Sequence, residues 1–366
     1  MNRLCQSSYG SLEAVINFAN PERKLVHFYR DRLTGKWHSA DIISNEPLSG
    51  GSIIQNAVKR HNNQEHGDFE VLVLEAGGLV KHYTRDNTLP VDSGEYAWQP
   101  PVIVNVKLDP KDDQEDNQEA SACSAAPLHQ SSIPAGDSLI GSTLETALLT
   151  KTGDVMHYRC PQRKGDSNDI SHKWELAGRI IQGATGPTCL FQGPKGDLRA
   201  LVPIPKNVVE LSFTDGVWKE MARTGNTYGP ACTWTPSPAD EPMCAILCID
   251  DEFTMLGWLK SKGCFCFNIN MQGSYNPSPL APSLPSALRR LALSPHYRAY
   301  PGNPISIVSQ SLNVLGHSPN AEAIVFHPCG SGWQDSWMIL QWSHLTTTKE
   351  WIVSDVVMAE VRGVPM

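Results

Sequence analysis

Short apolar runs separated by tight turns make up most of this chain. The run DFEVLVLE (68–75) is followed by the turn residues AGG and then by LVKHYTRD (79–86). Val, Ile, Leu and aromatic residues dominate such runs, while Gly, Pro, Asp and Asn fill the gaps, as in β-strands joined by turns. The combinations EAGG, KTGD and TDG provide residues that tolerate positive φ in hairpins. No long stretch keeps a helical period, and 283–294 is the best candidate for a helix. The pattern therefore predicts an all-β fold.

A larger unit repeats within this pattern. It consists of an opening strand, a second strand, a turn, a third strand with an aromatic residue, and a fourth strand that often holds Trp. Six such units align at a spacing of roughly 45–55 residues, and four strands per unit at this spacing are typical of β-propellers. We predict a six-bladed β-propeller with four-stranded antiparallel blades around a central channel, all in one domain. The blades are expected at approximately 1–45, 46–105, 130–182, 183–225, 226–270 and 303–366, with DSLIGS (137–142) as the first strand of the third blade and MCAILCI (243–249) as the second strand of the fifth.

A histidine precedes the aromatic residue on the third strand of the first three units. These pairs are His27–Phe28, His82–Tyr83 and His157–Tyr158. Later units keep the aromatic residue without the histidine, as in Gly257–Trp258 and Gln341–Trp342. We interpret the aromatic residue as packing between neighbouring blades and the histidine as hydrogen-bonding across the same contact. Packing explains better than catalysis why the aromatic residue persists where the histidine is lost.

Two long insertions, 106–135 and 271–303, each join the fourth strand of one blade to the first strand of the next. Such connectors emerge on one face of a propeller, together with the longest turn between a second and a third strand, 327–336. The first insertion is acidic and poor in apolar residues, which favours disorder in its middle. The second carries leucines, tyrosines and prolines. We expect it to fold over the mouth of the channel as a lid, with packing on the rim as the alternative.

Polar residues on the predicted first strands, with residues of the lid face, are the candidates for a ligand site. An apolar cavity with a few convergent hydrogen-bonding groups suits a small hydrophobic molecule. The candidate substrate-binding residues are Thr188, Gln192, Trp234, His296, Tyr297, Ser306 and Trp333. Arg3 and Gln55 lie on neighbouring first strands and are the candidate catalytic residues, because each can donate a hydrogen bond to a carbonyl oxygen. Any of these residues could instead be a satisfied residue of the channel wall.

Composition and charge exclude several classes of partner. The net charge is −8 over 366 residues and no run of Lys or Arg occurs, so nucleic acid and anionic membranes are not expected partners. No stretch approaches the roughly 20 apolar residues of a membrane span. The N-terminus lacks the apolar core of a signal peptide. The ten cysteines are scattered and no Asn-x-Ser/Thr site occurs, which favours a reducing compartment and a cytoplasmic location.

The motifs of common catalytic machinery are missing from the sequence. No phosphate-binding glycine loop, nucleophile elbow or zinc-protease histidine pair occurs. Cys244 and Cys248 would share one strand face, as would Cys264 and Cys266, and such pairs can hold zinc. Small buried thiols are the commoner reason for cysteine in strands. We therefore expect no cofactor and no metal, and an enzyme of this kind would act through shape and hydrogen bonds.

The segment DFEVLVLEAGGLVKHYTRDN (68–87), with its echo KLVHFYRD (24–31), resembles a group of fungal β-propeller proteins. Members include cofactor-free hetero-Diels-Alderases of tropolonic sesquiterpenoid biosynthesis, and lectin-like propellers share the broader strand pattern. The resemblance implies a pericyclase that joins a tropolone quinone methide to a humulene-type alkene. It transfers no catalytic residue, because the shared motif marks packing positions and the last three units lose the histidine.

Two functions of different classes follow from these observations. A pericyclase would hold a diene and a dienophile together in one cavity and polarise a carbonyl with a hydrogen bond. The alternative is a sugar-binding lectin-type propeller, with an Arg or Glu and a Trp at equivalent positions between blades. An interaction scaffold is a third possibility. The units diverge at such positions and the insertions share one face, which favours a single central site and hence the enzyme.

Overall fold

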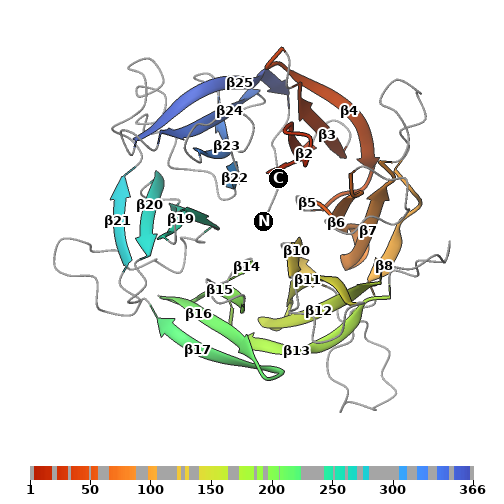
Figure 1. Cartoon of the computed structure of the whole chain (residues 1–366), viewed down its shortest axis with the longest axis vertical. Helices are drawn as coiled ribbons and strands as arrows, with labels where there is room; N and C mark the ends of the chain where they lie inside the picture. Colours follow the sequence, from red (N-terminus) through yellow and green to blue (C-terminus); the bar gives the residue numbers. More distant parts are fainter. Residues whose placement is uncertain are drawn as a thin grey trace.

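Six antiparallel sheets are arranged in a ring in the computed structural model (Figure 1). The predicted six-bladed β-propeller is therefore confirmed. Side chains are described for most of these residues up to Arg223, and only the backbone is described beyond it. The structure describes residues 4–18, 23–31, 34–48, 51–56, 66–87, 98–104, 122–124, 128–131, 140–163, 173–184, 188–192, 197–205, 207–223, 243–249, 252–259, 263–269, 275–279, 305–310, 320–328, 336–345 and 350–362.

Each blade is built from strands that follow one another in the sequence. Blade one contains β1 (Leu4–Gln6), β2 (Leu12–Phe18), β3 (Lys24–Arg30) and β4 (Trp37–Ser44). Blade two contains β5 (Ser52–Gln55), β6 (Phe69–Glu75), β7 (Leu79–Arg85) and β8 (Val102–Val104). Blade three contains β9 (Ala122–Ser124), β10 (Leu128–Ser131), β11 (Ile140–Thr150), β12 (Asp154–Arg163) and β13 (Glu175–Gln182). Blade four contains β14 (Cys189–Gln192), β15 (Leu198–Ile204), β16 (Asn207–Thr214) and β17 (Val217–Arg223). Blade five contains β18 (Met243–Ile249), β19 (Glu252–Leu259), β20 (Gly263–Ile269) and β21 (Tyr275–Pro279). Blade six contains β22 (Ile305–Gln310), β23 (Asn320–Pro328), β24 (Ser336–Leu345) and β25 (Glu350–Arg362).

The innermost strands of the blades contact one another in a closed circuit. The order is β1, β5, β10, β14, β18 and β22, and β22 contacts β1. The last strand of each blade lies on the outer rim, as β4, β17, β21 and β25 show (Figure 1). Within the described residues, blade one takes its strands from the N-terminal part of the chain and blade six from the C-terminal part. The ring therefore closes by packing between complete blades, without a blade shared by both ends.

The hydrophobic core is divided among the interfaces between successive blades. We call these interfaces seam one (blades one and two), seam two (blades two and three) and seam three (blades three and four). Successive side chains of a strand point to opposite faces: Val71 and Val73 of β6 pack in seam one, while Leu72 and Leu74 pack in seam two. Because both faces are covered, every residue of β6 is buried. This burial explains the unbroken apolar run from which the repeat was recognised.

Blade three begins where the sequence predicted an insertion. Its innermost strand is Leu128–Ser131, inside the predicted insertion 106–135, and the additional strand Ala122–Ser124 pairs with β11 from the same region. The predicted first strand DSLIGS (137–142) instead overlaps the start of β11. The strands Ala122–Ser124 and Leu128–Ser131 are short and have few apolar residues, so they show no alternation of apolar and polar positions in the sequence. The acidic middle of the insertion lies outside the described residues.

Blade five is displaced by one strand relative to the prediction. Met243–Ile249 was predicted as a second strand but is innermost, in contact with β14 and β22. Tyr275–Pro279 is the fourth strand, although it lies inside the predicted lid 271–303. The sequence did not predict this strand because it contains prolines. Proline is tolerated in a sheet mainly on edge strands, and a fourth strand is such an edge. The rest of the lid after Pro279 and the predicted helix 283–294 lie outside the described residues.

Helical structure is sparse in the part of the chain that the structure describes. The single helical element there is the 3-10 turn η1 (Ala76–Gly78) between β6 and β7, where Gly77 has φ of 85°. No helix among these residues is long and apolar enough to cross a membrane. In the same residues, no three His, Cys, Asp or Glu side chains are grouped to hold a metal ion. The cytoplasmic location stays a prediction.

Candidate functional site

Blades one to three repeat one polar pair within their apolar seams. A glutamate on the second strand faces a histidine on the third strand, and the Glu Oε2 to His Nε2 distances are 2.8, 2.9 and 2.7 Å in blade order. The register is the same in each blade, because the histidine lies two residues before the partner of the glutamate. The pairs are Glu13–His27, Glu70–His82 and Glu145–His157.

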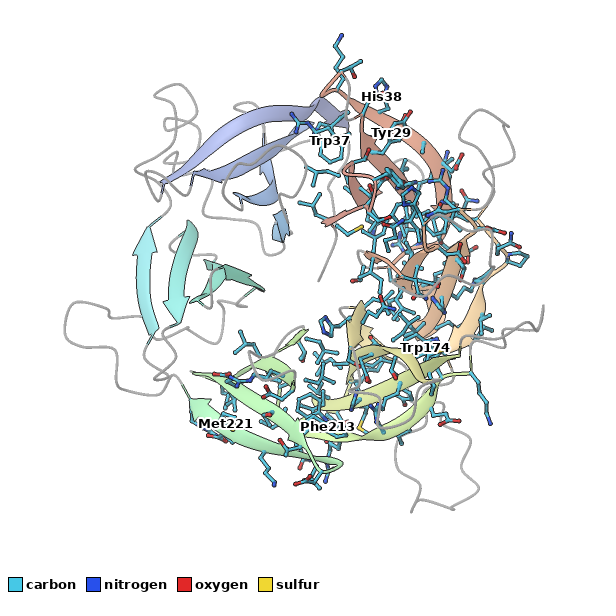
Figure 2. The ribbon with its side chains drawn as sticks, in the orientation of Figure 1. Tyr29, Trp37, His38, Trp174, Phe213 and Met221 are labelled. Carbon is cyan, nitrogen blue, oxygen red and sulfur yellow. The ribbon has the colours of Figure 1, made fainter. Side chains whose placement is uncertain are left out.

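The following blade supplies a donor to the other ring nitrogen of each histidine. In seams two and three this donor is an indole N–H at 3.3 Å from the histidine Nδ1, and Figure 2 shows Trp174 lying between blades two and three. In seam one Arg85 Nη1 lies 3.2 Å from His27 Nδ1. Trp98 there packs edge-on against the His27 ring, with centroids 5.7 Å apart. The two indole bonds are Trp174 to His82 and Trp218 to His157.

These repeated groups are sealed from solvent. The exposed fraction of every histidine and glutamate side chain in the three pairs is between 0% and 2%. The carboxylates receive further hydrogen bonds from Tyr9, Thr84 and Ser131. Tyr83 and Tyr158, which follow two of the histidines, are buried in the apolar clusters of seams one and two. The interpretation of the histidines as hydrogen-bonding between blades is therefore confirmed for the first three blades, and the interpretation of the aromatic residues as packing between blades is confirmed for Tyr83 and Tyr158.

Blade four has a basic residue at the register where blades one to three have the glutamate, and a glutamate where they have the histidine. Arg199 on β15 pairs with Ser212, and Glu210 lies two residues before Ser212. Arg199 thus occupies the glutamate position and Glu210 the histidine position, and Arg199 Nη1 donates to Glu210 Oε1 at 2.6 Å. The neighbours Leu198 and Ala200 pack in seam three. Because side chains alternate along a strand, Arg199 points to the other face of the blade, toward blade five.

Asp197 completes a charged cluster with this pair. Arg199 Nε and Ser212 Oγ both donate to Asp197 Oδ2, each at 2.8 Å. Burial acts to raise the pKa of Asp197, but the hydrogen bonds from Arg199 and Ser212 outweigh burial and lower it. Burial acts to lower the pKa of Arg199, but Asp197 and Glu210 outweigh burial and raise it. The site is therefore a guanidinium cation held between two carboxylates.

Solvent reaches this charged cluster, unlike the sealed pairs of the first three seams. The exposed fractions are 17% for Arg199, 20% for Asp197 and 8% for Glu210. A guanidinium offers five N–H donors and a carboxylate has four lone-pair sites. The cluster can therefore both donate hydrogen bonds to a polar ligand and accept hydrogen bonds from it. Sequence reasoning missed it, because the reversal of charge is recognisable only when the paired registers of the blades are compared.

The structure gives one predicted catalytic residue a role in joining blades. Gln55 Oε1 accepts a hydrogen bond of 2.5 Å from the Ser8 amide of blade one. Its Nε2 donates to the Gly67 carbonyl at 3.0 Å. These two bonds hold the Gln55 side chain against blade one and against the loop before β6. Contact between Gln55 and a substrate stays a prediction.

The other predicted site residues are only partly located. Thr188 directly precedes β14, is buried with 2% of its surface exposed, and has no hydrogen-bond partner for Oγ1. The first strands β14 and β22 contain Gln192 and Ser306, respectively, and the side chains of these two residues are not described. The residues outside the described part of the chain are Arg3, Trp234, His296, Tyr297 and Trp333.

Side chains of the described first strands point into the seams. Each blade extends outward from the axis (Figure 1), so the free backbone edge of its first strand faces the axis and the side chains alternate toward the two neighbouring blades. Ser52 and Ile53 are fully buried, and Ser52 Oγ accepts a hydrogen bond of 2.9 Å from the Leu128 amide. Gln130 Nε2 donates to Asn56 Oδ1 at 2.6 Å. A polar residue on a first strand is thus not by itself part of a channel wall.

Searches of family models and of curated proteins found no match to this sequence. Among solved structures, an Aleuria aurantia lectin variant in complex with Fucα1-6GlcNAc has a TM-score of 0.55 and 12% identity, with 98% of both chains covered. The same lectin, described as a six-bladed β-propeller with fucose recognition, gives 0.51 and 13%, again over 98% of both chains. An Arthrobotrys oligospora AofleA variant with three arginines replaced by alanine gives 0.56 and 10%, covering 100% of this chain and 91% of that chain. The chain therefore shares the six-bladed propeller fold of fungal lectin-like proteins.

Proposed function

We propose that this protein is a lectin-type propeller that binds a saccharide on the side of blade four that faces blade five. Arg199, Asp197 and Glu210 are its polar contacts in this proposal. The observation that carries it is the solvent-reachable Arg199–Glu210 pair, at the register that blades one to three fill with a sealed glutamate and histidine. The proposal departs from the enzyme favoured by the sequence, which rested on a central site.

The chemistry of the charged cluster suits a ligand rich in hydroxyl groups. A sugar hydroxyl both donates and accepts, so one hydroxyl can accept from Arg199 while another donates to Glu210 or Asp197. Hydrogen bonds to charged groups are worth about 1.5–3 kcal/mol each. The low pKa of Asp197 and the high pKa of Arg199 keep both groups charged near neutral pH. The site is therefore ready to bind a neutral polyol without a change of protonation.

Two structural neighbours support the choice of ligand class. The Aleuria aurantia lectin variant was solved with a fucose-containing disaccharide. The AofleA variant was made by replacing three arginines with alanine, which directs attention to arginine in propellers of this shape. In this chain Arg199 is the arginine that replaces the sealed glutamate of the earlier blades. We therefore choose an α-linked fucoside as the first probe.

The test is a calorimetric or NMR titration of the full chain with methyl α-L-fucoside. We expect Arg199→Ala to weaken binding at least tenfold, because loss of one charge-assisted hydrogen bond removes about 1.5–3 kcal/mol. The matched control is Arg223→Ala, which removes an arginine of the same blade that also pairs with a carboxylate, Glu220, at 2.9 and 2.7 Å. The control should bind as the wild type does. Failure to bind fucose, galactose and mannose glycosides, or equal affinity in Arg199→Ala, would reject the proposal.

Cofactor-free hetero-Diels-Alder catalysis is the second candidate function. Its substrates would be a tropolone quinone methide and a humulene-type alkene. The observation in its favour is the buried Thr188 hydroxyl at the start of an innermost strand, which has no hydrogen-bond partner. Such a hydroxyl can donate to a substrate carbonyl on which negative charge develops.

Incubation with a chemically generated quinone methide and the alkene tests this candidate. Cycloadduct should form faster than in buffer and with a bias in stereochemistry, measured by chiral chromatography. Thr188→Val keeps the shape and removes the donor, and it should lower the rate about 10- to 1000-fold. The wild-type rate should be unaffected by EDTA. An adduct rate and stereochemistry equal to those in buffer would eliminate this candidate and leave the saccharide proposal untouched.

A further inference from the structure

Arg199 is the one arginine on the second strands of the six blades, as the structure describes them, and these strands contain no lysine. Their sequences are LEAVINF (12–18), FEVLVLE (69–75), IGSTLETALLT (140–150), LRALVPI (198–204), EFTMLGWL (252–259) and NAEAIVFHP (320–328). The strand of blade four contains no glutamate, whereas each of the other five does. The second strand therefore supplies a guanidinium group in blade four alone.

The interface between blades four and five, which we call seam four, also differs on the side of blade five. In the other five blades a tryptophan lies at or shortly before the start of the fourth strand, as Trp37, Trp98, Trp174, Trp218 and Trp351. Blade five begins its fourth strand with Tyr275, which pairs with Ile269. In seams two and three this tryptophan donates to the histidine of the preceding blade. Seam four has Glu210 in place of that histidine and a tyrosine in place of the tryptophan, so the sealed arrangement is replaced from both sides.

The glutamates of seams one and two are occupied by neighbouring side chains. Glu13 accepts from Tyr9 at Oε1, and Glu70 accepts from Asn56 at Oε1 and from Thr84 at Oε2. The exposed fraction of either glutamate is at most 2%. A sugar hydroxyl could reach these carboxylates only if the two blades separated. The two seams therefore present no accessible carboxylate from this position.

Seam three contains an arginine that could rival Arg199. Arg159 Nε donates to Glu145 at 3.1 and 3.2 Å, and 32% of the Arg159 side chain is exposed. Glu145 itself is fully buried and also accepts from Ser131 at 2.8 Å. The Arg159 guanidinium lies over the Phe213 ring, 5.5 Å from its centroid, which covers one of its faces. A sugar at Arg159 would thus meet a cation without a carboxylate that it could reach, whereas in seam four solvent reaches the cation and both carboxylates.

The interfaces of blade five with blade six and of blade six with blade one lack such a pair of charges on the inner-facing strands. The second and third strands of blade five are EFTMLGWL (252–259) and GCFCFNI (263–269), and those of blade six are NAEAIVFHP (320–328) and SWMILQWSHL (336–345). None of these four strands contains arginine or lysine, and their acidic residues are Glu252 and Glu322. The second and third strands of these blades therefore cannot supply an ion pair like Arg199–Glu210.

We infer that the chain has a single saccharide site, in seam four, and binds one sugar per chain. This inference rests on the proposed function, and it adds that the other five interfaces hold the ring together without binding sugar. Linked sites raise the apparent affinity for a surface that displays many sugars by about 10²–10⁴. A chain with one site gains no such avidity and does not bridge two glycans. The protein thus suits recognition of one terminal sugar at a time.

Native mass spectrometry of the full chain with saturating methyl α-L-fucoside counts the sugars that are bound. We expect one sugar on the mass of one chain and none on Arg199→Ala. The count is made per chain, so self-association of the protein does not change it. The matched control is Arg159→Ala, which removes a partly exposed arginine beside a seam glutamate and should still bind one sugar. The stoichiometry from calorimetry should agree with these counts.

The possible results separate this inference from the proposed function. Two or more sugars per chain, or a sugar that remains on Arg199→Ala, would overturn the single site and leave saccharide binding in place. A count that falls from two to one in Arg159→Ala would overturn it by locating a second site in seam three. No binding to the wild type would reject both proposals. If Arg199→Ala does not fold, the counts for the wild type and for Arg159→Ala still decide.

Discussion

A single histidine on the innermost strand of blade three is placed where it stays uncharged. His129 pairs with Glu145 across β10 and β11, and its Nε2 is shielded from solvent without a hydrogen-bond partner. Burial lowers the pKa of His129 to about 4, against the opposing effect of Glu145. At the same register in blade four stands Phe191, the partner of Arg199. The sequence therefore places an aromatic residue at this register in a neighbouring blade.

We expect His129→Phe to make folding less sensitive to acid. The folded pKa of about 4 lies below the ~6.5 of an unfolded histidine. The contribution of a neutral His129 is therefore complete above pH ~6.5 and is lost as the pH falls toward 4, by about 3 kcal/mol in total. Urea unfolding at pH 7.5 and 4.5 measures it. A difference in unfolding free energy between variant and wild type that is the same at both pH values would contradict the assignment.

The residue pattern predicted that the histidines hydrogen-bond across the contact between blades, but it did not predict their partners. The aromatic residue beside each histidine recurs at a fixed place, which identified a structural contact. The donors come from the next blade, with Trp174 separated by 92 residues from His82 and Trp218 by 61 from His157. No local spacing encodes contacts at such separations. The Arg199–Glu210 site was missed for the same reason, since its meaning depends on comparison with other blades.

At the scale of elements, long buried strands were predicted well and short edge strands were not. β6 is apolar throughout because it is covered on both faces. The first strand Leu128–Ser131 and the fourth strand Tyr275–Pro279 pair on one side only within their sheets, and neither needs a continuous apolar face. Their sequences therefore resemble loops. Missing the first of these misplaced the start of blade three, and missing the second moved the predicted strands of blade five by one place.

The turn between β11 and β12 depends on a glycine that touches another strand end. Gly153 has φ of 83°, and an added Cβ would lie 3.3 Å from the Ala184 carbonyl oxygen. The Gly153 carbonyl also accepts from the amides of Gly183 and Ala184, both at 2.9 Å. We expect Gly153→Ala to destabilise the fold by about 1–2 kcal/mol from the left-handed backbone, and further from the close approach, as measured by urea unfolding at pH 7.5.

A second hairpin glycine separates these two effects. Gly216 has φ of 76° in the turn between β16 and β17, and an added Cβ there meets no atom within 4 Å. Gly216→Ala should therefore show the backbone cost alone. Equal losses of stability in the two variants would mean that the contact of Gly153 with Ala184 carries no cost of its own.

At the scale of the whole molecule, the period of the repeat was sufficient to predict six blades. An isolated four-stranded sheet leaves two faces uncovered, and a ring of sheets covers each face with a neighbour. The seams then provide the core, as the clusters that span blades one to four show. Function could not be predicted at this scale, because the fold is shared by proteins with different sites. The sites depend on departures from the repeat, such as Arg199.

Closure of the ring has a consequence for the order in which the protein is made. Seams between successive blades join segments that leave the ribosome one after the other, so each can form soon after its second blade emerges. The contact of β22 with β1 joins blade six to blade one, which are the last and the first blades of the ring in chain order. Blade one must therefore wait, with one face uncovered, until blade six has been synthesised. During that interval this face is the part of the nascent protein most in need of protection by a chaperone.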